Sequence, residues 1–286
     1  MRLSNVYAHR PTRFFVQLHS TKTGNPAQEA YCAGFEVEKW RCTALADHLI
    51  DWLADYALKE DELRVHHGNM YIRLKEAAIR IYTSNKYKKR GEIGEILLHA
   101  ICREFFGTIP FAPRVFYLTS SNDVVKSFDL AHVRTIDGKC ELWLGEAKFY
   151  EDTAAAVKAA INSITEHIDL GFLRSQKLIL GPQVSKSLAN YQEIRDLLST
   201  QTSLDELFDR AVFPILIAGE SSAAKKTKRA DDVYKAEIET ELIALSDLIS
   251  ASGLASKIKI MLIYLPLAEK SRLADEFDKR LKGLQL

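Results

Sequence analysis

The sequence predicts an α/β fold in which helices flank a mixed β-sheet, and three observations predict it. Short runs rich in β-branched and aromatic residues, typical of strands, recur along the chain. Longer segments repeat apolar residues at spacings of three and four, which places them on one face of a helix. From residue 91 onward the segments follow in the order helix, three strands, helix, further helices, strand, helix, strand and helix. That order is typical of a mixed sheet flanked by helices.

The composition excludes several classes of protein. Hydrophobic residues make up 47% and charged residues 27% of the 286 residues, which describes a folded globular chain and not a disordered one. No stretch approaches the length of a membrane span, and the N-terminus lacks the apolar core of a signal peptide. The four cysteines lack the paired short spacing of a zinc site and are sparse for a disulfide framework, so we expect reduced thiols in a cytoplasm.

Residues 1–84 are expected to form an N-terminal α/β extension, which is a candidate for binding a partner. The helix expected at 40–58 has an apolar face that must pack against another element. The elements expected in this part are strands at 13–20 and 31–37 around a Gly24-Asn25-Pro26 loop, and helices at 40–58 and 69–82.

Residues 85–286 are expected to form the core domain. Its first helix carries an apolar stripe from Ile93 to Phe105 and ends at Gly107, where a helix-terminating glycine is common. The elements expected after it are a strand at 114–119, a hairpin at 126–150, a helix at 154–168, a break at Gly181-Pro182, helices at 186–198 and from 204, a strand at 212–219, a surface loop at 220–230, a helix at 231–251, a strand at 257–265 and a helix from 267.

The hairpin can be predicted in register. Asp137-Gly138 between two strand-forming runs is a strong signal for a two-residue turn that needs positive φ at both positions. If Ile136 pairs with Lys139, then Asp129 lies opposite Glu146 on the same face of the hairpin. Directly opposed residues have Cβ atoms about 4.5–5.5 Å apart.

This register brings two carboxylates and a lysine to one place. Lys148 lies two positions after Glu146 and therefore points to the same face. Two neighbouring carboxylates repel unless they share a proton or hold a cation. Oxygen ligands of this kind suit Mg²⁺ or Mn²⁺, and the backbone carbonyl of Ala147 could supply another. Glu95, in the first turn of the preceding helix, is a further candidate, with Glu92 as its competitor.

Less specific explanations exist for each of these residues. An ion pair of Lys148 with Asp129 or Glu146 could hold the edge of the sheet without any catalysis. Glu92 and Glu95 could be charges that are favoured near a helix N-terminus.

Two basic clusters are candidate nucleic-acid contacts. The net charge of +1 gives no general attraction to a polyanion, so any such contact must be local. The first cluster precedes a helix N-terminus and could hold phosphates, although a solvated charge run is the commoner explanation. It contains Lys86, Lys88, Lys89 and Arg90 around Tyr87. The second, with a weaker claim, contains Lys225, Lys226, Lys228 and Arg229.

At Asp129 and at Glu146-Ala147-Lys148 the sequence resembles the PD-(D/E)xK nuclease superfamily, although Phe128 stands where that motif has proline. The stretches RGEIGEILLHAI, KSFDLAHVR and LWLGEAKFYED more closely resemble HamA, the nuclease-subunit family of Hachiman anti-phage defence systems. This resemblance implies a restriction-endonuclease-like core and a metal-dependent DNase that acts with a helicase partner, HamB. It places the metal ligands on Asp129 and Glu146, the motif lysine on Lys148 and a helical acid on Glu95.

Two functions remain open at this point. In the first, the chain is a Mg²⁺- or Mn²⁺-dependent DNA endonuclease that a helicase partner restrains and activates. In the second, it is a degenerate nuclease fold that binds DNA or regulates a helicase without cutting. The complete set of acids and lysine favours the first function. The absence of a GxxxxGK[ST] loop agrees with ATP use by another subunit.

Overall fold

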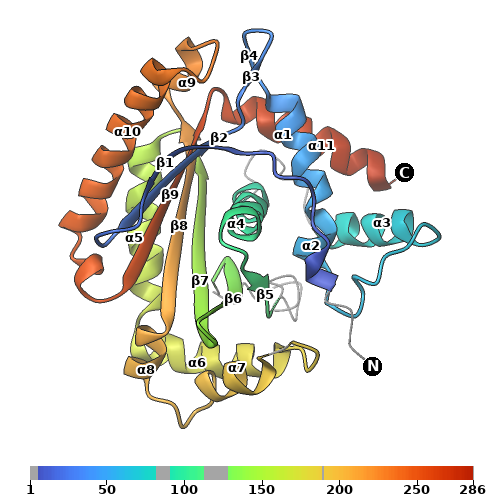
Figure 1. Ribbon diagram of the computed structural model, residues 1–286, viewed down its shortest axis with the longest axis vertical. Helices are drawn as coiled ribbons and strands as arrows, with labels where there is room; N and C mark the ends of the chain where they lie inside the picture. The colour runs from blue at the N-terminus through green and yellow to red at the C-terminus, as the bar shows by residue number, and fades with distance from the viewer. Residues whose placement is uncertain (1–5, 82–90, 113–127, 189, 286) are drawn as a thin grey trace.

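The computed structural model describes residues 6–81, 91–112, 128–188 and 190–285. A seven-stranded mixed sheet forms its centre, in the order β1-β2-β9-β8-β7-β6-β5 (Figure 1). The neighbouring strands β2, β9, β8 and β7 run parallel to one another. β1 is antiparallel to β2, β6 is antiparallel to β7, and β5 is antiparallel to β6. The strands are β1 (Val16–Thr21), β2 (Ala27–Cys32), β5 (Ile109–Pro110), β6 (Leu130–Ile136), β7 (Lys139–Tyr150), β8 (Ala211–Glu220) and β9 (Lys259–Leu267).

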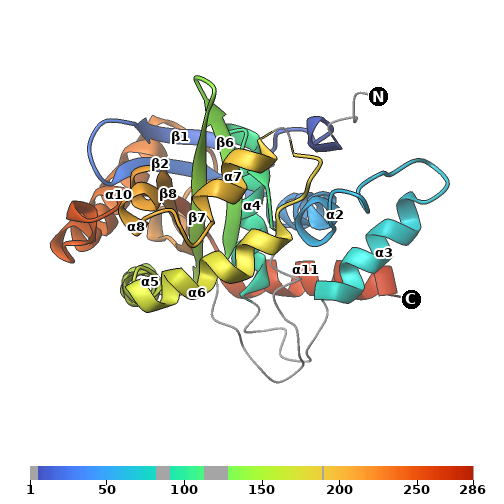
Figure 2. The ribbon, with the colours of Figure 1, turned by 90° about the horizontal axis from the view of Figure 1, so that it is seen from below.

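Helices cover both faces of this sheet, which confirms the predicted fold class (Figures 1 and 2). One face packs against α5 (Thr153–His167), α6 (Leu170–Leu180) and α10 (Asp232–Ala251). The other packs against α1 (Cys42–Asp51), α2 (Leu53–Ala57), α4 (Glu92–Phe105) and α11 (Lys270–Gln285). The remaining helices are α3 (Met70–Ile81), α7 (Tyr191–Leu197), α8 (Leu204–Asp209) and α9 (Ser222–Lys226).

The N-terminal part shares the central sheet. β2 pairs in parallel with β9, and α1 packs against α11 near the other end of the sequence. A segment before β1 crosses α4, where the Arg13 guanidinium donates to the Glu104 carbonyl at 2.8 Å (Figure 1). The domain boundary at residue 84 stays a prediction.

The second strand was predicted too late in the sequence. β2 ends at Cys32, and the chain then forms a small hairpin of β3 (Phe35–Glu36) and β4 (Lys39–Trp40). Val37 and Glu38 form its turn with φ of 46° and 59°. Positive φ is unusual for residues with a side chain, so neither residue type indicates a turn at this position.

Several helix boundaries also differ from the prediction. The helix predicted at 40–58 is divided at Trp52 into α1 and α2, and the helix predicted at 186–198 begins only at Tyr191. The predicted surface loop at 220–230 contains the short helix α9, which the Ser221 hydroxyl caps by accepting from the Ala224 amide. α6 was not predicted, and the strand predicted at 114–119 lies outside the described residues.

The hairpin of β6 and β7 has the predicted register. Ile136 pairs with Lys139, and the ladder continues without a shift to Leu130 and Gly145. Asp137 and Gly138 have φ of 48° and 77°, as their turn requires.

Candidate active site

Glu146 lies in the second half of β7 on the face that packs against α5. Alternation along the strand gives it the same face as Leu142 and Leu144, which belong to the core on that side. Only 2% of Glu146 is exposed. A buried carboxylate at this position needs nearby groups that stabilise or neutralise its charge.

Two groups approach the carboxylate of Glu146 from different elements. On β7, the Lys148 Nζ donates to Glu146 Oε1 at 2.6 Å. From α5, His167 Nδ1 lies 3.4 Å from Glu146 Oε2. The carboxylate thus lies between the strand that carries it and the helix that covers it.

Asp129 lies beside this group at the point where the hairpin ladder ends. Its amide donates to the Gly145 carbonyl at 2.9 Å. In the regular ladder Gly145 pairs with Leu130, so this hydrogen bond is shifted by one residue along the chain. Its side chain turns back to the partner strand, where Asp129 Oδ2 accepts from the Ala147 amide at 2.9 Å. The regular pairing ends one residue before the predicted partnership of Asp129 with Glu146, yet the hairpin still brings the two acids together.

The electrostatics of the group reflect this crowding. Burial, and after it the charge of Asp129, raise the pKa of Glu146 to about 7, against the opposing effects of Lys148 and Ser163. Burial disfavours the charge on Lys148, but the Glu146 carboxylate outweighs it, so the pKa of the ammonium is raised. Lys148 is therefore a cation near neutral pH, whereas Glu146 is close to its midpoint of titration.

Glu95 approaches from the opposite face of the sheet, on α4. It is buried, and its Oε2 accepts a hydrogen bond from the Tyr56 hydroxyl of α2. Glu92 is only half-buried. Tyr56 also lines a small pocket together with Asp129. Glu95 thus fits an interior role better than Glu92 does.

Gly94 allows α4 to approach the sheet closely. A Cβ atom at this position would lie 3.2 Å from the Phe149 Cβ and 3.5 Å from the Ala147 Cβ. The close approach puts the first turn of α4 directly over the strand that carries Glu146 and Lys148.

The donor set fits a cation that takes two carboxylates from the protein. Within the described residues, no three His, Cys, Asp or Glu side chains lie close enough together to hold a metal ion. Glu95 therefore does not form a three-acid group with Asp129 and Glu146. Mg²⁺ commonly takes one or two carboxylates and completes its shell with waters and substrate phosphate. Asp129 and Glu146 meet that requirement, and a cation there would relieve the repulsion that raises the pKa of Glu146.

The sequence reasoning did not identify Tyr56, Ser163 or His167 as neighbours of these acids. Tyr56 lies in the helix predicted at 40–58, and nothing in its spacing indicates a contact with Glu95. The spacing of four between Ser163 and His167 does place them on one face of α5. That signal alone could not indicate which strand residue they face.

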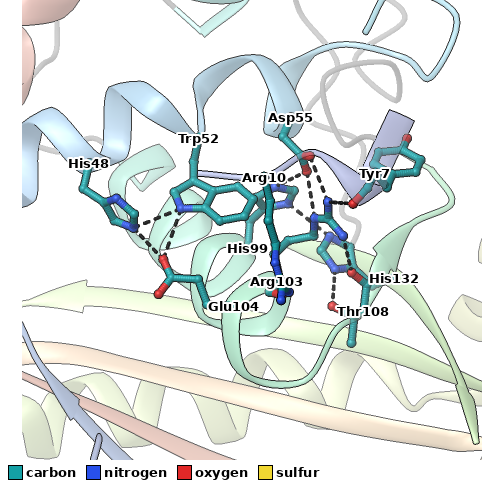
Figure 3. Close-up of polar contacts among 10 residues, drawn as sticks. All are labelled: Tyr7, Arg10, His48, Trp52, Asp55, His99, Arg103, Glu104, Thr108 and His132. Carbon is teal, nitrogen blue, oxygen red and sulfur yellow. Dashed lines mark hydrogen bonds and ion pairs between the residues drawn. The ribbon is translucent and has the colours of Figure 1, made fainter. Parts of the chain in front are cut away.

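A buried polar network connects α4 to the N-terminal helices (Figure 3). Asp55 of α2 contacts His99 at 2.8 Å and Arg103 at 3.1 Å, both on α4. His99 then contacts His132 at 3.1 Å, and His132 contacts the Thr108 hydroxyl at 2.8 Å. Burial lowers the pKa of both His99 and His132.

A second part of this network surrounds Glu104 (Figure 3). The carboxylate contacts His48 Nε2 at 2.5 Å and accepts from the Trp52 indole at 3.2 Å. It also accepts from the Phe14 amide at 3.2 Å. Together these contacts tie α1 and the segment before β1 to the last turn of α4.

Of the two basic clusters that are candidate nucleic-acid contacts, only the one at residues 225–229 lies within the described residues. Lys86, Lys88, Lys89 and Arg90 lie outside the described residues. In the second cluster, most of the charges are compensated by acids. The pairs are Lys225 with Glu220, Lys228 with Glu38 and Arg229 with Asp231. This pairing weakens the case for a nucleic-acid contact at residues 225–229.

All four cysteines are buried and free of disulfides. Burial raises the pKa of Cys32 to about 11 and that of Cys42 to about 12, so these thiols are poor nucleophiles at neutral pH. In the described part of the chain, no helix has both the length and the apolar character to cross a membrane.

Comparison with known proteins gives one family match and one curated relative. The model of the HamA family matches residues 12–281. A curated relative, anti-bacteriophage protein A of Escherichia coli (strain K12), is 22% identical over 256 residues. The match covers 87% of this chain and 46% of the relative, so the chain spans about half the length of that protein.

Proposed function

Because the chain belongs to the HamA family of anti-phage defence proteins, we propose that it is a metal-dependent DNA endonuclease, the effector of a defence system. The proposal also includes a helicase subunit, HamB, that restrains the nuclease and activates it on foreign or damaged DNA. The resemblance to the PD-(D/E)xK nucleases supports metal-dependent cleavage of DNA. The geometry of the site supports the choice of Asp129, Glu146 and Lys148 as the residues involved.

One observation carries this proposal, namely the buried Glu146 beside Asp129 with Lys148 at 2.6 Å. A sheet that needed only an ion pair would gain nothing from a second acid that raises the pKa of the first. A pair of neighbouring carboxylates is costly to fold and is useful when a cation binds between them.

Asp129 and Glu146 would hold Mg²⁺ or Mn²⁺, with the Ala147 carbonyl as a further predicted ligand and Glu95 as an outer acid. When bound, the metal would polarise a phosphoryl oxygen and lower the pKa of a bound water. Lys148 stays protonated, so it would orient the attacking water and offset the negative charge that develops on the phosphate. A general-base role would require the loss of this proton, which the Glu146 carboxylate opposes.

The exposed apolar side chains of α3 mark the first surface to test for the helicase subunit. Met70, Tyr71, Ile72 and Ile79 are all more than half exposed on this helix of the N-terminal part. Ile72 and Ile79 are seven residues apart and share one helix face. Replacing both with lysine should abolish co-purification with the helicase and leave the melting temperature of the isolated chain unchanged.

The proposed activity is tested by cleavage of supercoiled plasmid and linear DNA. The purified chain is assayed alone and with the helicase and ATP, in Mg²⁺ or in EDTA. We expect cleavage that needs Mg²⁺ and that falls at least ~100-fold in Glu146→Ala and in Lys148→Ala. Lys158→Ala is the matched control, because Lys158 is exposed on α5 away from the acids.

The non-catalytic alternative makes the opposite prediction. If the chain is an adaptor, Glu146→Ala and Lys148→Ala should protect cells against phage as well as the natural protein does. Absence of cleavage in every combination, together with intact defence in both variants, would refute the nuclease proposal.

A further inference from the structure

α5 presents two polar side chains to the carboxylate of Glu146. Ser163 and His167 lie four residues apart on one face of this helix. His167 is the last residue of α5, is 4% exposed, and has Nδ1 3.4 Å from Glu146 Oε2. The Ser163 hydroxyl also stabilises the ionised carboxylate. Neither residue belongs to the motif positions to which the nuclease resemblance assigns a role.

Aromatic packing fixes the ring of His167. The ring stacks on Phe172, with centroids 4.7 Å apart and planes 17° apart. Its other neighbour is Phe128, whose centroid is 4.9 Å away and whose backbone leads directly into Asp129. Rotation of the imidazole would therefore disturb the residue that precedes the second acid of the site.

The two oxygens of Glu146 are not held equally. Lys148 donates to Oε1 at 2.6 Å, whereas Oε2 accepts no well-aligned hydrogen bond from any residue that the structure describes. The last torsion of a glutamate side chain is broad, so a carboxylate held at one oxygen can turn. A polar group that faces the second oxygen restricts this rotation.

We propose that His167, together with Ser163, positions the carboxylate of Glu146 from the α5 side and keeps it in the orientation that the cation site needs. This inference rests on the proposed nuclease function. His167 would contact neither DNA nor the scissile phosphate, so it is a positioning residue. Groups that orient a ligand of a metal are typically worth about 10- to 100-fold in metal affinity or activity.

Three substitutions of His167 separate its polar atom from its packing. Asparagine carries its amide nitrogen at the position of Nδ1, whereas glutamine carries it one bond further out. Phenylalanine keeps a ring between Phe128 and Phe172 but has no polar atom. For each full-length variant, the Mn²⁺ affinity and the melting temperature without metal are measured by calorimetry. The kcat and KM with linear DNA are measured in the presence of the helicase and ATP.

We expect His167→Phe and His167→Gln to weaken Mn²⁺ binding and to lower kcat by about 10- to 100-fold, with the KM for DNA unchanged. His167→Asn should recover most of both losses. Ser163→Ala should weaken Mn²⁺ binding in the same direction by a smaller factor.

Two results would overturn the inference. One is natural Mn²⁺ affinity and natural kcat in His167→Phe, even with a lower melting temperature, because that pattern describes packing alone. The other is a His167→Asn variant that performs no better than His167→Gln. Failure of the proposed function is distinguishable, because the unsubstituted chain would then neither bind Mn²⁺ nor cut DNA.

Discussion

At the scale of single residues, the site is built at a cost to the stability of the fold. Glu146 has a pKa of about 7 in the folded protein and about 4.5 when exposed. The folded state therefore binds the proton more tightly, and the contribution of Glu146 to the free energy of unfolding falls as the pH rises from about 4.5 to above 7. Active-site residues commonly reduce stability in this way.

Glu146→Gln should consequently stabilise the protein at pH 8. Because glutamine never ionises, we expect a gain of about 1–3 kcal/mol there and little change at pH 5. Urea denaturation at both pH values measures this difference. Glu237→Gln, an exposed site on α10, serves as the control and should change neither value. A Glu146→Gln variant that is less stable at pH 8 would contradict the assigned electrostatics.

Tyr56→Phe tests the contact between the N-terminal helices and Glu95. The change removes a hydroxyl that donates to a buried carboxylate, and the loss should cost about 1–3 kcal/mol of unfolding free energy. Chemical denaturation measures it, with Tyr71→Phe on the exposed face of α3 as the control. Equal stability of the two variants would show that the hydroxyl of Tyr56 contributes nothing to the fold.

At the scale of elements, the contact of α4 with β7 depends on the lack of a side chain at Gly94. Gly94→Val should destabilise the protein by about 1–3 kcal/mol, because its side chain meets Phe149 and Ala147. Thermal unfolding measures the change. Gly283→Ala in α11 is the matched control, since a Cβ atom there meets nothing within 4 Å and alanine favours the helix. An unchanged melting temperature in Gly94→Val would contradict the close packing.

The elements that could be predicted from the sequence are those set by local interactions. The register of the β6–β7 hairpin follows from the Asp137-Gly138 turn and the two-residue period of its strands. β8, with its continuous apolar run, was predicted to within a residue at each end. The start of α5 was predicted to within a residue, and the Asp152 carboxylate caps this helix by accepting from the Ala155 amide.

The elements that could not be predicted depend on tertiary contacts. β2 ends shortly before Gly34, whose φ is 76°, and the chain then turns at Val37 and Glu38. The glycine could have indicated the end of the strand, but neither residue type indicates the turn that follows. Asp129 and Glu146 were found because a hairpin places them together. Tyr56 and His167 were not, because each reaches its carboxylate from a helix that packs on the sheet only in the folded chain.

At the scale of the whole molecule, the buried network around Asp55 makes stability depend on pH. Burial lowers the pKa of His99 and, even further, that of His132, whereas both would titrate near 6.5 when exposed. The unfolded state thus binds more protons below that value, and stability is lost as the pH falls through about 6.5. Burial alone would raise the pKa of Asp55, but His99 and Arg103 outweigh it and lower the value, so its contribution is lost only in stronger acid.

We therefore expect the contribution of His99 and His132 to the free energy of unfolding to decrease between pH 7 and pH 5, opposite in sign to that of Glu146. Over this range the free energy of unfolding of His132→Gln should fall less than that of the natural protein. Urea denaturation at several pH values measures both slopes. His67→Gln is the control, because His67 is exposed outside the network. A slope that is the same in His132→Gln and in the natural protein would assign the pH dependence to other groups.

The position of β9 between β2 and β8 has a consequence for synthesis of the protein. β2 is made before β5, β6, β7 and β8, but its parallel partner β9 is made after all of them. Until β9 emerges, β1 and β2 form a hairpin whose inner edge is unpaired, and such edges bind other chains. The other strands of this sheet must therefore all be made before β2 gains its inner neighbour, and a nascent chain will need protection from aggregation until then.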